Sequence, residues 1–192
     1  MIRPQGKGYM ICALALSKAT PMIKTNHLQL IRCEPTHIAA FLRGKSELGA
    51  LLQVAIPESW PHFPEAFSLP DDATPPQTIW GGYLFLYPKE RVLVGNGGFK
   101  GQPDETGTVE IGYEIASEYW NRGFASEAAQ GMIDFAFSHD QVQAVCAHTL
   151  GEKNASNRVL QKAGMKFAAE IDDAEFGKIW RWEIRRDAYQ QA

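Results

Sequence analysis

The feature that most constrains this chain is a strand, a short polar turn and a helix in immediate succession between residues 108 and 139. Residues 108–116 alternate apolar and polar side chains, which predicts a strand. From Gly123 to His139 apolar residues recur at helical spacing, so a helix is expected to begin directly after the turn. The first backbone N–H groups of a helix lack intrahelical partners and, together with the helix dipole, attract anions. The junction therefore predicts an anion-binding site, with a plain strand-to-helix connection as the alternative.

The turn itself has the composition of a phosphate loop. Gly123 would let a ligand approach the backbone closely, and Ala125 keeps the next contact small. Arg122 can add a charge-assisted hydrogen bond to a phosphate. The turn carries neither the Gly-Lys-Ser/Thr of a triphosphate loop nor the complete Gly-x-Gly-x-x-Gly of a dinucleotide site. A diphosphate is accordingly the ligand that this turn fits.

Around this junction, the pattern of the chain predicts one mixed sheet. Strands are expected at 28–32, 78–87, 91–99, 108–116, 144–150, 167–171 and 178–184, and helices at 37–43, 47–54, 123–139 and 155–163. Thr36 is the expected cap of the first helix. This order predicts an α/β (α+β) fold, a mixed and mainly antiparallel twisted sheet with helices on both faces. The proline-rich segments 57–64 and 70–76 are expected to form an ordered aromatic loop or a mobile lid over a site.

Composition limits the classes of function. The chain has 192 residues, of which 45% are hydrophobic, and this suits one globular domain. Its formal net charge of −3 argues against a nucleic-acid partner, and no apolar run is long enough to indicate a membrane span. The three cysteines, Cys12, Cys33 and Cys146, lack the spacing of a metal site or a disulfide framework, so no metal is expected.

The first 24 residues are expected to be an N-terminal extension, followed by a single domain over residues 25–192. Arg3, Lys7 and the apolar run 9–16 resemble a signal peptide, although this run is short. Cysteines without a disulfide pattern favour a reducing compartment, which predicts a cytoplasmic protein.

Three segments together resemble the GNAT acetyltransferase superfamily, in particular its ribosomal-protein N-acetyltransferase (RimJ/RimL-like) group. They are Glu110-Ile-Gly-Tyr113, Tyr119-Trp-x-x-Gly-Phe-Ala-Ser-Glu-Ala128 and Asn154-Ala-Ser-Asn-Arg-Val-Leu-Gln-Lys-Ala-Gly164. The resemblance is strongest from Glu110 to Phe167. It implies the GNAT fold and an acyltransferase that moves an acetyl group from acetyl-CoA to a primary amine.

The resemblance also implies where acetyl-CoA, the expected co-substrate, is held. Its diphosphate would lie on the turn, at the residues Asn121, Arg122, Gly123, Phe124, Ala125 and Ser126. Backbone groups of Ile115 and Ala116 would pair with the pantetheine arm, and Asn154 would contact the same arm. Judged from the residues alone, Asn154 is a helix N-cap and Gly164 the matching glycine after the helix, and both roles of Asn154 are compatible.

Acetyl transfer needs a base for the amine and an acid for the departing thiolate. By resemblance, Glu110 is the candidate base and Ser156 the candidate acid. Glu114, on the same face of the strand, is a second candidate for the base. The alternatives are that both carboxylates face solvent and that Ser156 only supports the first turn of its helix. The tyrosine that many superfamily members place in this helix is missing, since Leu160 and Gln161 stand in its neighbourhood. His148, on the preceding strand, is either a group that titrates near neutral pH or a packed residue.

The acceptor site is the least constrained part of the prediction. Trp60 and Phe63, which stand between prolines, are expected to form an apolar wall, and Glu114 to attract a cationic amine. Trp80 is expected in the core. The acceptor is a protein N-terminus or a small-molecule amine that attacks directly in a ternary complex, and the family makes a homodimer possible. The alternative is an acyl-CoA-binding sensor or interaction module on the same fold, without efficient catalysis.

Overall fold

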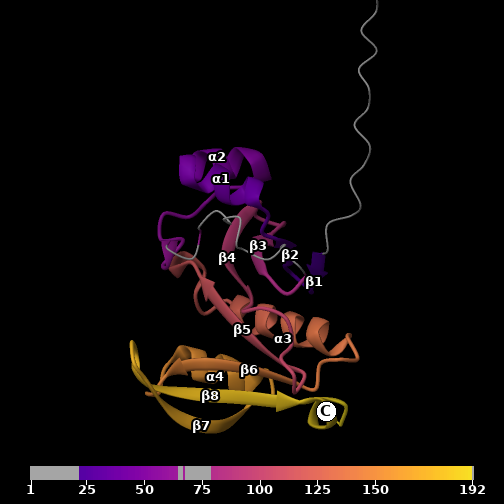
Figure 1. The fold of residues 1–192 in the computed structure, drawn as a ribbon. Coiled ribbons are helices and arrows are strands. Elements are labelled where there is room, and N and C mark those ends of the chain that lie inside the picture. The colour runs from indigo at the N-terminus through magenta and orange to yellow at the C-terminus, as the bar shows by residue number, and fades with distance from the viewer. Residues whose placement is uncertain (1–21, 65–66, 68–78, 192) are drawn as a thin grey trace, which may run out of the picture.

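The computed structural model describes residues 22–64, 67 and 79–191 (Figure 1). Its eight strands form one mixed sheet in the order β1-β2-β3-β4-β5-β6-β8-β7. The strands are β1 (Met22–Lys24), β2 (Gln29–Arg32), β3 (Gly82–Tyr87), β4 (Val92–Phe99), β5 (Thr108–Ile115), β6 (Ala144–Leu150), β7 (Lys166–Asp173) and β8 (Gly177–Arg185). Only β5 and β6 are parallel, so the predicted fold class, mixed and mainly antiparallel, is confirmed.

Helices cover both faces of the sheet, as predicted. They are α1 (Pro35–Arg43), α2 (Lys45–Leu52), α3 (Phe124–Phe137), α4 (Ala155–Lys162) and the short α5 (Arg186–Tyr189), with a 3-10 turn at Ser117–Tyr119. Along β3 the side chains alternate between the two faces: Tyr83 and Phe85 join the core under α3, whereas Leu84 joins the core under α1 and α2. The two cores therefore hold the two helical layers on one sheet.

Some element boundaries differ from the prediction for local reasons. Thr36 does not cap α1; Glu34 occupies the N-cap position, and its N–H donates to Nδ1 of His37 at 3.0 Å. The first residue of a helix has no helical partner for its N–H group. Proline, which lacks this group, therefore suits that position, and Pro35 occupies it. β1 begins at Met22, three residues before the predicted start of the domain. The predictions for Cys12, for residues 9–16 and for 70–76 lie outside the described residues.

Burial raises the pKa of both cysteines in the described part of the chain. Cys33 and Cys146 are free and buried. Burial, with a smaller effect of Glu34, raises the pKa of Cys33 to about 12, and burial is also the main reason that the pKa of Cys146 rises to about 11. A thiolate is the nucleophile and the metal ligand, so these two thiols are packing residues.

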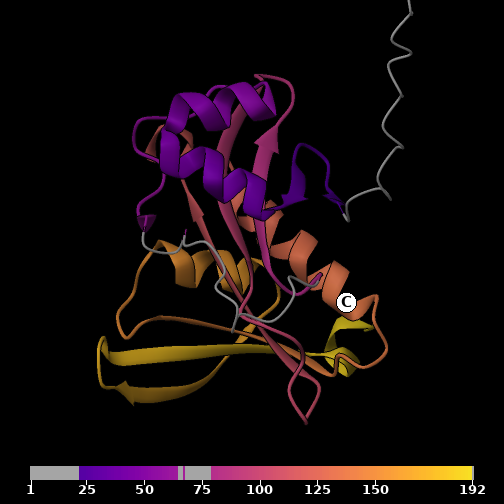
Figure 2. The same cartoon turned by 45° about the horizontal axis from the view of Figure 1, so that its top comes forward.

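The sheet opens between β5 and β6. Their parallel pairing covers only Thr108–Glu110 against Ala144–Cys146, after which β5 continues beside β4 and β6 continues beside β8. Figure 2 shows the magenta strands diverging from the orange and yellow strands. This separation, next to the first turn of α3, sets the position of the candidate site.

Candidate functional site

The separation of β5 from β6 leaves part of β5 with a free backbone edge. The Lys100 N–H donates to the Glu110 carbonyl at 2.9 Å, and the Ala116 N–H donates to the Val94 carbonyl at 2.9 Å. Since backbone groups alternate in direction along a strand, the even-numbered residues of β5 turn toward β4. The N–H and C=O groups of the odd-numbered residues after Glu110 therefore turn toward the gap. These are Ile111, Tyr113 and Ile115.

The first turn of α3 presents unpaired backbone donors beside this gap. Asn121 and Gly123 both have left-handed backbone conformations, with φ of 59° and 86°, which reverse the chain sharply before the helix. Gly123 is the N-cap residue, and the first helical hydrogen bond runs from the Glu127 N–H to the Gly123 carbonyl at 3.0 Å. The N–H groups that precede Glu127 in the helix have no partner within it. They are the donors that the predicted anion site would require.

A cavity of about 530 Å³ joins the gap to this turn. Most of the residues predicted to bind acetyl-CoA line it: Ile115, Asn121, Gly123, Phe124, Ala125 and Ser126. Further lining comes from His62, Phe63, Tyr113, Glu114, Tyr119, Trp120, Ala155, Ser156, Arg158, Val159 and Lys162. The cavity thus runs from the turn before α3, along the free edge of β5, to α4.

Arg122, which the sequence predicts to bind phosphate, is instead paired with Glu90. Its guanidinium pairs with Glu90 at 2.6 Å and lies over the rings of Tyr87, Tyr119 and Phe124 at 5.1 to 5.4 Å. The hydrogen bond and charge of Arg122 lower the pKa of the Glu90 carboxyl below its usual range. Arg122 is outside the cavity lining and holds the turn to the β3–β4 hairpin.

The cations that line the cavity come from α4 and escaped the sequence prediction. Arg158 and Lys162 are four residues apart, so they lie on the same face of the helix. This face stands across the cavity from the first turn of α3. The only local sign of these cations is the spacing of Arg158 and Lys162, four residues apart in the helix that follows Asn154. Such a basic pair is equally typical of a solvated helix face.

Ile115 and Ala116 differ in what they can offer a ligand. The N–H of Ala116 is bonded to Val94 and its carbonyl accepts the Tyr119 N–H, so both backbone groups are already used. The Ile115 carbonyl lies in the gap, where it accepts the Trp120 indole N–H at 2.6 Å. The free edge therefore offers Tyr113 and Ile115 to an extended ligand, with Trp120 as a competitor at Ile115.

Asn154 and Ser156 lie at the start of α4. Asn154 is the N-cap residue, as predicted, and its Oδ1 accepts the Asn157 N–H at 3.1 Å. Gly164, with φ of 80°, follows the helix and allows the Met165 N–H to reach the Leu160 carbonyl at 3.0 Å. Asn154 itself does not line the cavity, whereas Ser156 does.

The aromatic loop is held against the end of β5. Trp60 is fully buried, packs on Phe41 and Phe67, and donates its indole N–H to Oδ1 of Asn96 at 2.5 Å. Trp60 therefore anchors the loop in the core and does not line the cavity, contrary to the prediction. Phe63, which is 59% exposed, does line it. Glu114 lines the cavity too, and its carboxylate accepts the His62 N–H at 3.0 Å. Trp80 is buried in the core, as the sequence predicted.

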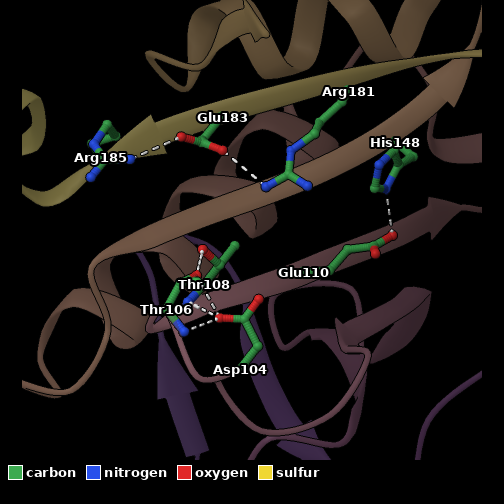
Figure 3. A network of polar contacts seen from close by, with 8 residues as sticks. All are labelled: Asp104, Thr106, Thr108, Glu110, His148, Arg181, Glu183 and Arg185. Atoms are coloured by element: carbon green, nitrogen blue, oxygen red, sulfur yellow. Dashed lines mark hydrogen bonds and ion pairs between the residues drawn. The ribbon is translucent and has the colours of Figure 1, made fainter. Parts of the chain in front are cut away.

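Glu110 lies on the face of the sheet turned away from α3, because its neighbours Val109 and Ile111 are buried in the core under that helix. Its carboxylate contacts Lys100 at 2.5 Å and His148 Nδ1 at 3.0 Å, as Figure 3 shows for His148. Partial burial raises the pKa of this carboxyl group, but the hydrogen bonds and charges of Lys100 and His148 outweigh it. The net pKa lies below the ordinary value of glutamate.

The residues fit coenzyme A better than they fit a metal ion. The cavity joins unpaired helix N–H groups and two cations, which suit phosphates, to a free strand edge, which suits the amides of a pantetheine arm. An ideal Cβ placed on Gly123 meets no atom within 4 Å, so the turn faces open space. Among residues 22–64, 67 and 79–191 no group of three or more His, Cys, Asp or Glu side chains could hold a metal.

Comparison with known proteins identifies the class of fold. The family model described as "Acetyltransferase (GNAT) domain" matches residues 27–166, well over half of the chain. The chain belongs to the GNAT acetyltransferase family. Proteins of this family bind coenzyme A or acetyl-CoA.

Two bacterial relatives share parts of the sequence. "Uncharacterized N-acetyltransferase YjdG" of Bacillus subtilis (strain 168) is 36% identical over 88 residues, which are 46% of this chain and 51% of that protein. "Uncharacterized N-acetyltransferase p20" of Bacillus licheniformis is 31% identical over 86 residues, which are 45% of this chain and 48% of that protein. The matched part spans about half the length of each relative.

Solved structures share the fold over nearly the whole chain. A GNAT acetyltransferase from Bacillus anthracis has a TM-score of 0.60 at 21% identity, covering 87% of this chain and 99% of that one. The ribosomal L7/L12 alpha-N-protein acetyltransferase RimL, solved in complex with coenzyme A, has a TM-score of 0.62 at 14% identity and covers 88% and 99%. At these identities the likeness concerns the fold alone.

Proposed function

We propose that this protein is an acetyl-CoA-dependent N-acetyltransferase that acts on a primary amine. The observation that carries the proposal is the cavity that joins the first turn of α3 to the free edge of β5. It provides, in one continuous space, donors for a diphosphate and a strand edge for the pantetheine arm. The thioester would then lie where β5 and β6 separate, and the amine would approach from the face that carries Glu110.

The chemistry follows from this placement. The amine must lose a proton before it attacks the acetyl carbon directly in a ternary complex, and we assign this proton transfer to the site of Glu110. Ser156, in the cavity wall, is the candidate donor of a proton to the departing sulfur. Leu160 and Gln161 stand in the neighbourhood where the resemblance leads us to expect a tyrosine acid, and neither side chain is a proton donor of this kind.

For the acceptor, Phe63 and Glu114 offer an apolar surface and a carboxylate at the mouth of the cavity. They suit a cationic amine, either a protein N-terminus or a small molecule. The fold likeness to RimL supports a place in the RimJ/RimL-like group, and we propose a homodimer by resemblance to that family. We further propose a domain over residues 25–192 after an N-terminal extension, and a cytoplasmic location. No helix in the described part of the chain has the length and apolar character needed to cross a membrane.

The test is donor binding followed by turnover. Purified protein with acetyl-CoA should release free thiol in the presence of at least one member of a panel of peptides with free N-termini, polyamines and aminoglycosides. Mass spectrometry of the acceptor should show the added acetyl group. Tight binding of acetyl-CoA without thiol release for any acceptor would favour the acyl-CoA sensor, and failure to bind CoA at all would contradict both functions.

A further inference from the structure

Figure 3 shows Glu110 and His148 pointing toward one another within a cluster of polar side chains. The buried neighbours of Glu110 place this pair on the face of the sheet opposite α3. His148 lies on this face because its neighbours on β6 turn the other way: Ala147 is buried in the core and Thr149 bonds to Asn157 of α4. We propose that the imidazole of His148 takes the proton from the acceptor amine, and that Glu110 positions this imidazole. The inference rests on the proposed acetyltransferase activity and names the group that serves as its base.

The first argument is position. Glu110 and Cys146 are the last residues that β5 and β6 pair. His148 is two residues further along β6 and on the same face, where it stands opposite Gly112 across the opening gap. Gly112 has no side chain to fill this space, and the nearest atom to a Cβ built there is Lys100 Cε at 4.0 Å. Neither His148 nor Glu110 lines the cavity itself. The imidazole lies beside the gap where β5 and β6 separate, which is where the proposed function would bring the thioester and the amine together.

The second argument is basicity. The Glu110 carboxylate is shared by Lys100 and His148, which stabilise its charged form. A carboxylate held in this way is poorly matched to accepting a proton from an amine near neutral pH. Imidazole, by contrast, is the side chain that ordinarily changes charge in this range. Of the two groups, the imidazole is the better proton acceptor.

The third argument is orientation. A neutral imidazole that donates from Nδ1 to Glu110 carries its lone pair on Nε2. Glu110 then has the role that a carboxylate plays behind a histidine base: it fixes the tautomer and stabilises the imidazolium that forms. Lys100, in turn, holds the carboxylate ionised.

The proton balance is simple. Nε2 of His148 takes one proton from the ammonium group and leaves a neutral amine. The amine nitrogen forms a bond to the acetyl carbon, the carbon–sulfur bond breaks, and the second nitrogen proton goes to the sulfur. The imidazolium returns its proton to solvent, so each turnover yields one amide, one thiol and one proton.

Charged groups from the neighbouring elements also face His148. Arg181 of β8 is its cross-strand partner and pairs with Glu183 at 2.9 Å, Lys100 follows β4, and Asp173 ends β7. The pKa of Asp173 is lowered mainly by hydrogen bonds from the Phe176 and Glu175 N–H groups, with smaller effects of the charges of His148 and Lys100. The carboxylates near the ring are thus Glu110, Asp173 and Glu183, and the cations are Lys100 and Arg181.

The kinetic test compares His148→Gln with Glu110→Gln. His148→Gln should lower kcat/KM by about 100-fold or more and remove the acidic limb of its pH profile, with CoA affinity changed by less than about twofold. Glu110→Gln should retain this limb, moved to lower pH because the carboxylate no longer stabilises the imidazolium, with a smaller loss of rate. If Glu110 were itself the base, Glu110→Gln would abolish the limb and His148→Gln would leave it.

His27→Gln is the matched control. His27 forms a similar pair, Nδ1 to Glu127 Oε2 at 2.9 Å, but it lies between β1 and β2, far along the sheet from the gap between β5 and β6, and its replacement should leave the pH profile unchanged. The ring tautomer supplies a readout that needs no acceptor. In histidine-labelled protein, ¹⁵N spectra should show neutral His148 protonated at Nδ1, and Glu110→Gln should shift it toward Nε2.

The outcomes separate this inference from the proposed function. A wild-type protein in which neutral His148 is protonated at Nε2 would overturn the inference while leaving the enzyme intact. The same holds for an active His148→Gln variant that keeps the acidic limb. Loss of CoA binding in the wild type would instead refute the acetyltransferase, and if no amine in the panel is accepted, the tautomer alone decides.

Discussion

At the residue scale, the cleft takes its positive charge from α4. Arg158 and Lys162 line the cavity opposite the first turn of α3, while Arg122 is committed to Glu90. The phosphates of coenzyme A carry several negative charges, and the net charge of the whole chain is −3. Local cations are therefore needed to offset the repulsion, and the two on α4 are placed to do so.

The first prediction concerns these two residues. Arg158→Gln and Lys162→Gln should each weaken CoA binding by about fivefold, on the order of 1 kcal/mol for an exposed charge-assisted contact. The slope of affinity against salt should also fall. Lys166→Gln, on the exposed start of β7, is the control and should bind CoA normally. Titration calorimetry at two salt concentrations measures both effects, and equal affinities for all three variants would contradict the assignment.

At the element scale, α4 depends on a side-chain cap at its N-terminus. The second prediction is that Asn154→Ala lowers the free energy of unfolding by about 1 kcal/mol, because the Asn157 N–H loses its acceptor. Asn154→Asp keeps an acceptor and should remain within a few tenths of a kcal/mol of the wild type. Urea unfolding of the three proteins provides the comparison. A destabilisation by Asp as large as that by Ala would show that the cap is unimportant.

The loop 57–64 is the second element whose position matters, since it carries Phe63 to the cavity. Its Ser59 hydroxyl and N–H both donate to the Glu118 carboxylate, the N–H at 3.3 Å. The Ser59 hydrogen bond is the main reason that the pKa of Glu118 falls to about 2. A carboxyl group whose pKa is lower in the folded than in the unfolded protein stabilises the fold above the unfolded pKa. That stabilisation is lost as the pH falls through the folded value.

The third prediction follows from this sign. Between pH 7 and pH 2 the melting temperature should fall further for the wild type than for Glu118→Gln, because the variant has no carboxylate to protonate. The difference should be small, since Glu118 is exposed and water screens its charge. Thermal unfolding at several pH values tests it. Parallel curves for the two proteins would mean that Glu118 does not hold the loop.

At the scale of the whole molecule, the local patterns of the sequence predict the elements but not the cleft. β6 and β5 match the prediction to within one residue because their alternation is clear, and Asn154 and Gly164 mark the ends of α4 correctly. β1 was missed because three residues carry no detectable period. The place where β5 leaves β6 depends on pairing between distant segments, which no local pattern encodes.

The side chains of the candidate site show the same limit. The turn 120–125 was identified from its own sequence, since a helix start with Gly123 is a local anion site. Trp60 was expected in the cavity wall, yet its burial follows from packing on Phe41 and Phe67, which are distant in sequence or lie across the loop. The contact of Glu110 with His148 likewise exists only because two strands are paired in parallel.

The most direct measurement of the central claim compares CoA binding to Gly123→Asp and Gly123→Asn by calorimetry. Both side chains tolerate the left-handed conformation and enter open space at this position, so both variants should fold. They differ by one negative charge at the helix start. We expect Gly123→Asp to lose at least about 30-fold more affinity than Gly123→Asn, on the order of 2 kcal/mol. Equal affinities of the two variants for CoA would contradict a phosphate site at the first turn of α3.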